Sequence, residues 1–408
     1  MFEQNQPVSS EELQRRQDAV RFHLQTIAPG AGGILVFSRL NIYYLTGTAG
    51  QGVLWLPLSG EPVLMIRKGV NRARLEAGVR HIVSFKSYSQ LSGICSDAGS
   101  PLTPTVAVVM SGLTWQLGMM LEAKLKDHKL VSGDHAIALA RMVKSEFELE
   151  ILRRCGARHH KCLHDIIPRM IRPGMTEREI AHKCWESFFA EGHMGILRMQ
   201  AHDEEAFLGH VSAGNSGNYP SSFNGPLGLR GEHPASAVMG SAQKVWEPGE
   251  PLMLDIGFQL EGYQTDKTQA YFAGSESSIP DNVRRAHDFC IELQAWMMEH
   301  GKPGATPAEL YEHCLAEAER KGFSEGFMGL DENQVPFVGH GIGLTVDEFP
   351  PLAKGFDLPL QKGMVLALEP KQSIRDVAMV GVENTFEVTD NGLRSISGDS
   401  YAMIPIDG

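Results

Sequence analysis

The fold is decided by the stretch Leu252-Met-Leu-Asp-Ile-Gly-Phe-Gln-Leu-Glu-Gly-Tyr-Gln-Thr-Asp266, in which two aspartates lie eleven residues apart around a Glu261-Gly262 turn. Apolar runs on both sides of the turn predict a β-hairpin, in which positions symmetric about the turn face each other. Asp255 and Asp266 fit that geometry. Two carboxylates placed opposite each other in apolar surroundings resist ionisation unless a positive charge lies between them. A metal ion is the obvious candidate, although an isolated Asp pair is more often solvated.

The composition is that of an ordinary globular protein. The chain has 408 residues, enough for two domains, with 42% hydrophobic and 21% charged residues. A net charge of -12 without a local basic patch argues against nucleic acid as a partner. No signal-peptide pattern or bilayer-spanning apolar stretch is apparent, so we expect no membrane partner and a cytoplasmic location. The six cysteines lack a Cys-x-x-Cys pair and are expected to be small buried residues in a reducing compartment.

The first part of the chain, residues 1–140, reads as an α/β domain. The capping-box spacing at Ser9 predicts a helix that ends at Ala28. Short apolar runs then alternate with helical stretches, as expected of an α/β domain. The predicted strands are 33–37, 53–56, 62–66, 81–85 and 105–109. The segment Asn41–Gly47 is expected to be a turn between the first two strands.

The second part, residues 141–408, is predicted to be an α+β domain with helices and an antiparallel sheet. The predicted helices are 144–172, 176–191, 281–300 and 307–321, and further strands are predicted at 363–369, 379–388 and near Ala402. The glycine-rich stretch 209–231 is read as a long loop, either beside a binding site or as a plain surface excursion.

A second acidic pair strengthens the metal hypothesis. Glu369 and Glu383 each follow apolar residues and are placed symmetrically about a turn at Arg375-Asp376. Between the two hairpins stands His340, flanked by glycines that permit close backbone approach. Four carboxylates and one imidazole suit two divalent ions such as Mn, Co, Fe or Zn, and suit a thiolate-type zinc site less well.

These residues resemble, in order, spacing and local sequence, the metal ligands of peptidase family M24, which includes aminopeptidase P, prolidase and methionine aminopeptidase. The matching residues are Asp255, Asp266, His340, Glu369 and Glu383. Asn41–Gly47 also resembles a motif of the creatinase-like N-terminal domain, and residues 141–145 resemble the entry to the catalytic domain. The resemblance implies a pita-bread catalytic domain with an antiparallel sheet and flanking helices, preceded by a smaller creatinase-like domain.

The resemblance also implies a mechanism. In it Asp255 chelates one metal, His340 and Glu369 bind the other, and Asp266 and Glu383 bridge them. A hydroxide between the metals would cleave the C–N bond of a short peptide, as in Xaa-Pro aminopeptidases and dipeptidases. Glu369 would carry a proton from water to the leaving nitrogen. A homodimer is also implied.

Three positions depart from the pattern of the proline-specific enzymes. Asp347 stands where a second histidine is usual, and Gly381 stands where an arginine is common. A histidine expected about seventeen residues before Asp255 is missing, and His233 is the nearest imidazole. In the family these positions contact substrate and the tetrahedral intermediate, so the departures leave the metal chemistry intact and the substrate class open.

Asp347 is therefore either an acid or base facing the substrate, or a turn residue. His233 either substitutes for the missing histidine or lies on the surface before Pro234. Other histidines show no ligand spacing and are read as structural: His159, His160, His202 and His210. Two alternatives to a peptidase remain, namely a relative that hydrolyses a small-molecule C–N bond or acts as a lyase through Asp347, and a non-catalytic interaction module.

Overall fold

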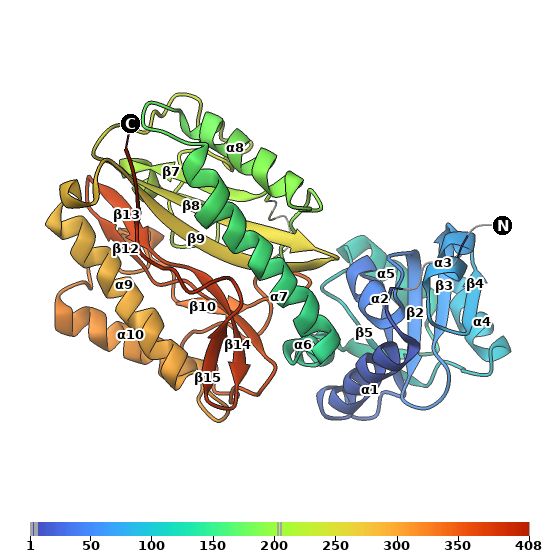
Figure 1. The fold of residues 1–408 in the computed structure, drawn as a ribbon. Coiled ribbons are helices and arrows are strands. Elements are labelled where there is room, and N and C mark those ends of the chain that lie inside the picture. The colour runs from blue at the N-terminus through green and yellow to red at the C-terminus, as the bar shows by residue number, and fades with distance from the viewer. Residues whose placement is uncertain (1–2, 4–6, 202–203, 205, 408) are drawn as a thin grey trace. The chain divides into compact units, whose positions relative to one another are not determined.

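The computed structural model describes residue 3, residues 7–201, residue 204 and residues 206–407. The chain forms two compact units, Met1–Arg141 and Met142–Gly408. Figure 1 shows the helices and strands of each unit in chain order. Within the described residues, no helix has the length and apolar character needed to cross a membrane, and all six cysteines are buried and unpaired.

The first unit is built on a six-stranded mixed sheet in the order β4-β3-β2-β1-β5-β6. Its strands are β1 Gly33–Val36, β2 Gln51–Pro57, β3 Val63–Lys68, β4 His81–Ser84, β5 Thr105–Val108 and β6 Lys129–Ser132. Its helices are α1 Ser10–Ile27, α2 Arg39–Thr46, α3 Val70–Glu76, α4 Leu91–Asp97 and α5 Trp115–Lys124, followed by α6 Asp134–Met142 at the boundary. Five of the strands are those predicted.

Two features of this unit differ from the prediction. The predicted turn at Asn41–Gly47 is the helix α2, and Gly47 is its left-handed C-cap with a φ of 83°. The glycine was therefore a helix stop and was misread as part of a turn. Strand β6 was missed because it is a short edge strand without a buried residue, so its sequence carries no apolar run.

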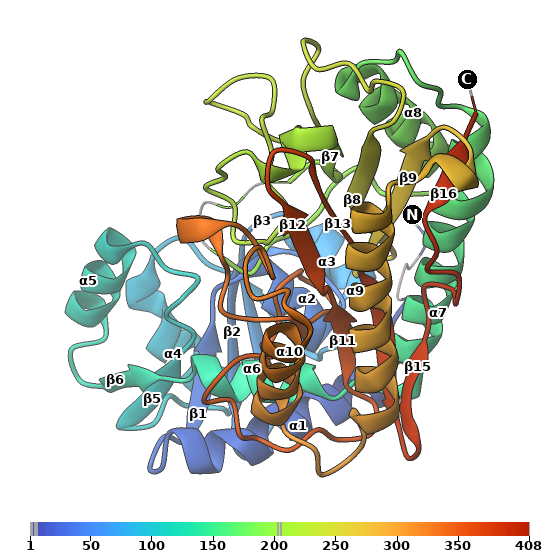
Figure 2. The same ribbon diagram turned by 90° about the vertical axis from the view of Figure 1, so that its left-hand side faces the viewer.

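The second unit places its sheets between two pairs of helices (Figures 1 and 2). The first pair is α7 Glu146–His160 and α8 Glu177–Ala190, and the second is α9 Asp281–His300 and α10 Pro307–Lys321. Ser145, Thr176 and Thr306 begin three of these helices with complete capping boxes. The predicted helix ends are therefore close to the observed ones, except that α7 passes into a π-helical turn at Lys161–Ile166.

Three sheets form the interior of this unit. The first has the order β16-β9-β8-β7, the second β10-β11-β14-β15, and β12 pairs with β13 alone. The strands are β7 Gly209–Ala213, β8 Pro251–Leu260, β9 Tyr263–Ala273, β10 Gly339–Gly341, β11 Val365–Leu368, β12 Lys371–Ile374, β13 Ala378–Gly381, β14 Asn384–Thr389, β15 Gly392–Ser395 and β16 Ile404–Ile406. Strand β7 corrects the prediction of a loop from residue 209, because these five residues form an edge strand on β8.

The hairpin of β8 and β9 has the predicted turn but a different register. Positive φ angles at Glu261 and Gly262 make the two-residue turn. The turn pairs Leu260 with Tyr263, so the ladder opposes Asp255 to Thr268 and Gly257 to Asp266. The two aspartates therefore share one face of the hairpin but lie two residues out of step. The expectation that they face each other directly was wrong.

The second acidic pair has the predicted symmetry. The ladder of β12 and β13 opposes Lys371 to Gly381, which places Glu369 and Glu383 symmetrically just beyond its end. The predicted single strand 379–388 breaks at Glu383 into β13 and β14. At that break Glu383 forms a β-bridge with Thr268 of β9. This bridge connects the two hairpins at the point where their acidic residues lie.

The core beneath β7 and β8 depends on a buried carboxylate at the start of α8. Glu177 is fully buried and accepts hydrogen bonds from the backbone N–H groups of Ala213 and Ser241, each at 2.9 Å. It thereby ties the last residue of β7 to Ser241, within the irregular segment that leads to β8. Burial raises the pKa of this carboxyl group.

We expect Glu177→Ala to lower the free energy of unfolding by about 3 kcal/mol, because two buried N–H groups lose their acceptor. Chemical denaturation monitored by circular dichroism measures the change. The control is Glu186→Ala on the same helix, whose exposed pair with Lys183 is worth less than about 1 kcal/mol. Equal effects of the two substitutions would contradict this role for Glu177.

Candidate metal centre

The predicted ligands line one open pocket in the second unit. The pocket has a free volume of about 510 Å³, including its mouth. Its floor is formed by Asp255, Asp266, His340, Glu369 and Glu383. Apolar side chains complete its walls, and they include Leu197, Met199, Leu208, Phe223 and Val346. Five residues spread over about 130 positions of sequence are therefore brought together by the three sheets.

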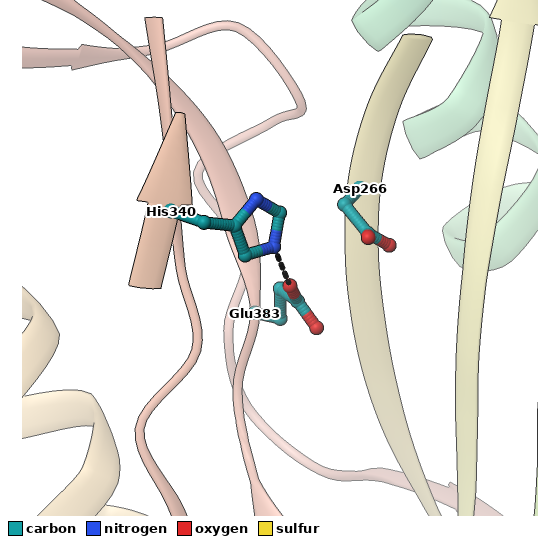
Figure 3. Close-up of side chains that lie close together, drawn as sticks. All are labelled: Asp266, His340 and Glu383. Atoms are coloured by element: carbon teal, nitrogen blue, oxygen red, sulfur yellow. Dashed lines mark ion pairs between the residues drawn. The ribbon is translucent and has the colours of Figure 1, made fainter. Parts of the chain in front are cut away.

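Asp266, His340 and Glu383 form the tightest group. Each offers one ligand atom, and these atoms lie within 4.8 Å of one another. Figure 3 shows that the three side chains come from separate segments of the chain, with the imidazole and the Glu383 carboxylate joined as an ion pair. The His340 Nε2 to Glu383 Oε1 distance is 3.7 Å. An imidazole and two carboxylates suit a divalent transition ion.

The orientation of His340 is fixed by its own backbone. Its Nδ1 lies 3.0 Å from the carbonyl oxygen of Gly341, which can only accept a hydrogen bond. Nδ1 therefore carries a proton whether the ring is charged or neutral. Burial opposes the charged ring, but Asp347, Glu383 and Glu369 raise the pKa of His340 well above its usual value. With an ion at the triad, the neutral ring would offer the lone pair of Nε2 to that ion. A backbone acceptor on the far nitrogen is the usual arrangement around a metal-ligating histidine. The triad therefore fits one divalent ion.

A lysine that the sequence analysis did not single out lies within the acidic cluster. Lys371 is completely buried, and its Nζ lies 3.1 Å from Asp255, 3.2 Å from Glu369 and 2.7 Å from Glu383. In the sequence, Lys371 is one polar residue in a short strand and carries no motif. Its position becomes clear only from the pairing of β12 with β13. It contacts three of the five predicted ligands.

The pKa values at the site reflect carboxylates buried together. Burial, with repulsion from Glu383, raises the pKa of Glu369 to about 8, although Lys371 and His340 oppose the rise. Burial likewise raises the pKa of Asp255 to about 6 and that of Asp266 well above its usual value. Burial would also raise the pKa of Glu383, but Lys371 and His340 hold it below its usual range. Glu383 is thus the carboxylate that the two nitrogen groups keep ionised.

Asp347 lies at the same site. Its Oδ1 is 3.7 Å from His340 Nδ1, and its Oδ2 is buried without a hydrogen-bond partner among the described residues. The residue lines the pocket and has a φ of 63°, in the left-handed region that non-glycine residues seldom adopt. Burial raises the pKa of its carboxyl group, against the pull of His340. A carboxyl oxygen without a hydrogen-bond partner in a pocket is available to a substrate.

One of the histidines that were read as structural, His210, lies at the pocket. His210 lines the pocket from β7, where it is paired with Asp255, and its buried Nε2 has no partner among the described residues. It was read as structural because it shows no ligand spacing in the sequence. His233 is exposed in a turn outside the pocket lining, and His202 lies outside the described residues. His159 is buried against Thr265 in the core.

Comparison with known proteins places this geometry in a family. Residues 150–390 match metallopeptidase family M24, and residues 23–143 match the creatinase/prolidase N-terminal domain. An Xaa-Pro dipeptidase of Pyrococcus furiosus is 22% identical, over 89% of this chain and 92% of its own length. A probable dipeptidase PepE of Mycobacterium tuberculosis is 26% identical, over 93% of this chain and 94% of its own length.

Solved structures agree on the fold. The dipeptidase PepE from Mycobacterium ulcerans has a TM-score of 0.79 at 24% identity, covering 98% of this chain and all of its own. An Xaa-Pro dipeptidase from Bacillus anthracis has a TM-score of 0.80 at 21% identity, covering 96% of this chain and 99% of its own. The second unit has the pita-bread fold and the first is creatinase-like, as predicted. The chain belongs to metallopeptidase family M24.

Proposed function

We propose that this protein is a metal-dependent hydrolase of short peptides, with Xaa-Pro dipeptides as the preferred class. The observation that carries the proposal is the triad of Asp266, His340 and Glu383 at the floor of an open pocket. The names of the relatives, dipeptidases and Xaa-Pro dipeptidases, support the substrate class. The proposal includes the homodimer and the cytoplasmic location expected from the sequence.

Residues of the chain would bind the ion and transfer the proton during hydrolysis. A divalent ion at the triad would lower the pKa of a water molecule and polarise the scissile carbonyl. Asp266, His340 and Glu383 would hold that ion. Glu369 faces the same space. Burial raises the pKa of its carboxyl group to about 8 without an ion, and a bound ion would favour the ionised form, which would accept a proton from water and return it to the leaving nitrogen. The role predicted for Glu369 is therefore retained.

The pocket walls suit a small peptide. Apolar side chains such as Leu208 and Phe223 offer a surface for a proline ring, and no arginine is among the described residues that line the pocket. Asp347 presents an unpartnered carboxylate oxygen, which would attract the amino terminus of a dipeptide or exchange a proton with the substrate. We propose Asp347 as the residue of the pocket that contacts the substrate's polar end.

A second candidate function rests on that same residue. The Asp347 carboxyl group occupies the place of a family histidine, and burial raises its pKa. This favours an acid or base in a non-peptide reaction, such as hydrolysis of a cyclic or guanidino C–N bond or a lyase reaction.

Metal analysis separates both enzyme hypotheses from a non-catalytic interaction module. Less than one bound ion per chain, after Mn or Co is supplied, would exclude both enzyme hypotheses.

Xaa-Pro dipeptides and tripeptides should be hydrolysed in the presence of Mn or Co, and removal of the metal with a chelator should abolish the activity. Liquid chromatography of the released proline measures the rate. Asp266→Asn should lower kcat by about 1,000-fold or more, because it removes a charged ligand. If the wild-type protein turns these substrates over no faster than Asp266→Asn does, the result would count against the peptidase.

Asp347→Asn should lower kcat/KM by about 10- to 1,000-fold without changing the metal content. Steady-state kinetics and elemental analysis of the same preparation test both parts. A rise in KM alone identifies a contact to the substrate's amino group, and a fall in kcat identifies a proton carrier. His233→Ala is the matched control, because His233 is exposed outside the pocket lining. Wild-type kinetics for Asp347→Asn would remove this residue from the mechanism.

The metal-free protein should become less stable as the pH rises from 4.5, the usual pKa of Glu369, to about 8, its pKa in the folded chain. In this window the unfolded chain has released the proton that the folded chain still binds. The free energy of unfolding therefore falls as the pH rises. His340, whose folded pKa is raised by Asp347, Glu383 and Glu369 against burial, acts in the same direction above 6.5.

Thermal unfolding of chelator-treated protein across this range measures that slope, and Glu369→Gln should flatten it. A slope that is unchanged in Glu369→Gln would show that another group is responsible. Adding Mn should raise the Tm more at pH 8 than at pH 6, because the ligands must lose their protons to bind the ion.

A further inference from the structure

Lys371 lies where the sequence analysis expected a second metal. The expected pair of ions uses Asp255 on one side and His340 on the other, with Glu383 between them. In the structure the Lys371 ammonium occupies the Asp255 side, within 3.2 Å of Asp255, Glu369 and Glu383. The ammonium donates to Glu369 and Glu383 and forms an ion pair with Asp255.

The two glutamates divide their oxygens between two positions. Glu383 turns Oε2 to Lys371 and Oε1 to His340 Nε2. Glu369 does the same, with Oε2 toward Lys371 and Oε1 3.8 Å from His340 Nε2. The site therefore has two cation positions, and the chain itself fills one of them. The second is the triad that fits a divalent ion.

The fold holds Lys371 in this place. Its backbone is anchored on both sides by Met328, whose N–H donates to the Lys371 carbonyl and whose sulfur accepts from the Lys371 N–H. Across the ladder stands Gly381, where a Cβ atom would lie 2.5 Å from the Pro370 carbonyl oxygen and 2.7 Å from the Lys371 Cα. The glycine, which departs from the family's usual arginine, thus leaves room for the lysine.

Displacing the ammonium would be costly. The Lys371 side chain is completely buried, so an ion that took its position would leave an unpaired ammonium in the protein interior beside a divalent cation. Glu369 and Glu383 would also have to give up their hydrogen bonds to it, and Asp255 its ion pair. The dinuclear site implied by the resemblance therefore fits this chain only in its His340 half.

We propose that the Lys371 ammonium is a built-in cation that replaces the second metal, so that this protein works with one divalent ion, held by Asp266, His340 and Glu383. The inference rests on the proposed function, because it assumes that the triad binds an ion. It deepens that function by giving the number of ions and by assigning a role to Lys371 and Gly381. The lysine holds Asp255 and Glu383 in position through its contacts at 3.1 and 2.7 Å.

The test is the metal count and the magnetic coupling in the full-length protein. Metal-free protein is titrated with Mn(II) and followed by electron paramagnetic resonance, with elemental analysis after dialysis. The wild type should bind one ion, leave a second equivalent in solution and show no exchange-coupled signal. Lys371→Ala should bind two ions with an exchange-coupled signal, and its second site should be at least about 100-fold tighter than in the wild type.

Two further variants make the result specific. Lys371→Met keeps the length of the side chain without its charge, and it should bind the second ion less well than Lys371→Ala because the space stays filled. Lys267→Met is the matched control, since Lys267 is also a buried lysine in this unit but donates to the Asn384 amide. It should bind one ion, as the wild type does.

The outcomes are distinguishable. Two tightly bound, coupled ions in the wild type would overturn the role of Lys371 while leaving the proposed hydrolase intact. One ion in both the wild type and a folded Lys371→Ala would also overturn it. No ion in any variant would overturn the proposed function together with this inference. Because the wild-type titration alone can refute the proposal, it does not depend on the folding of a variant.

Discussion

The burial of four carboxylates in one place is the constraint on which the rest of the site depends. Asp255, Asp266, Glu369 and Glu383 lie between sheets whose other faces are apolar, and like charges at that distance cannot all remain ionised without positive charge. The chain supplies part of that charge through Lys371 and orients His340 toward the rest. A divalent ion at the triad would complete the balance. The chemistry of the site therefore follows from its electrostatics.

The sheets make this arrangement rigid. Asp266 and Glu383 belong to different hairpins, and their backbones are joined by the bridge between Thr268 and Glu383. The Thr385 hydroxyl adds a second tie, since it accepts from the Asp266 N–H and donates to the Asp266 carbonyl. Ligands on paired strands keep their geometry before an ion arrives, which lowers the cost of binding it. The helices outside these sheets support the strands and contribute no ligand.

The substrate side of the pocket is built differently. Its residues include Asp347, on a backbone with positive φ, and His210, on an edge strand. Both keep a buried polar atom that no described residue satisfies. Such atoms are costly in a folded protein unless they have a partner in the working complex. Asp347, one of the departures from the family pattern, therefore lies where we propose that the substrate binds, and Gly381, another, lies opposite Lys371.

Much of the architecture was determined by the sequence alone. Capping boxes and helix stops located the long helices, because these signals involve neighbouring residues only. The order and spacing of Asp255, Asp266, His340, Glu369 and Glu383 predicted a ligand set, because the family's local motifs surround each residue, and all five line one pocket. The turn at Glu261-Gly262 was likewise readable from its two residues.

Tertiary structure decided what depends on pairing between distant segments. The register of the β8–β9 hairpin placed Asp255 opposite Thr268, although the turn itself was predicted. His210 reached the pocket because residues 209–213 pair with β8, which their glycine-rich continuation concealed. Lys371 is unremarkable in sequence, and its role becomes visible only when Gly381 is found opposite it and three carboxylates surround its ammonium. Local signals fix where elements begin and end, whereas the charge that a buried side chain meets is set by neighbours from other parts of the chain.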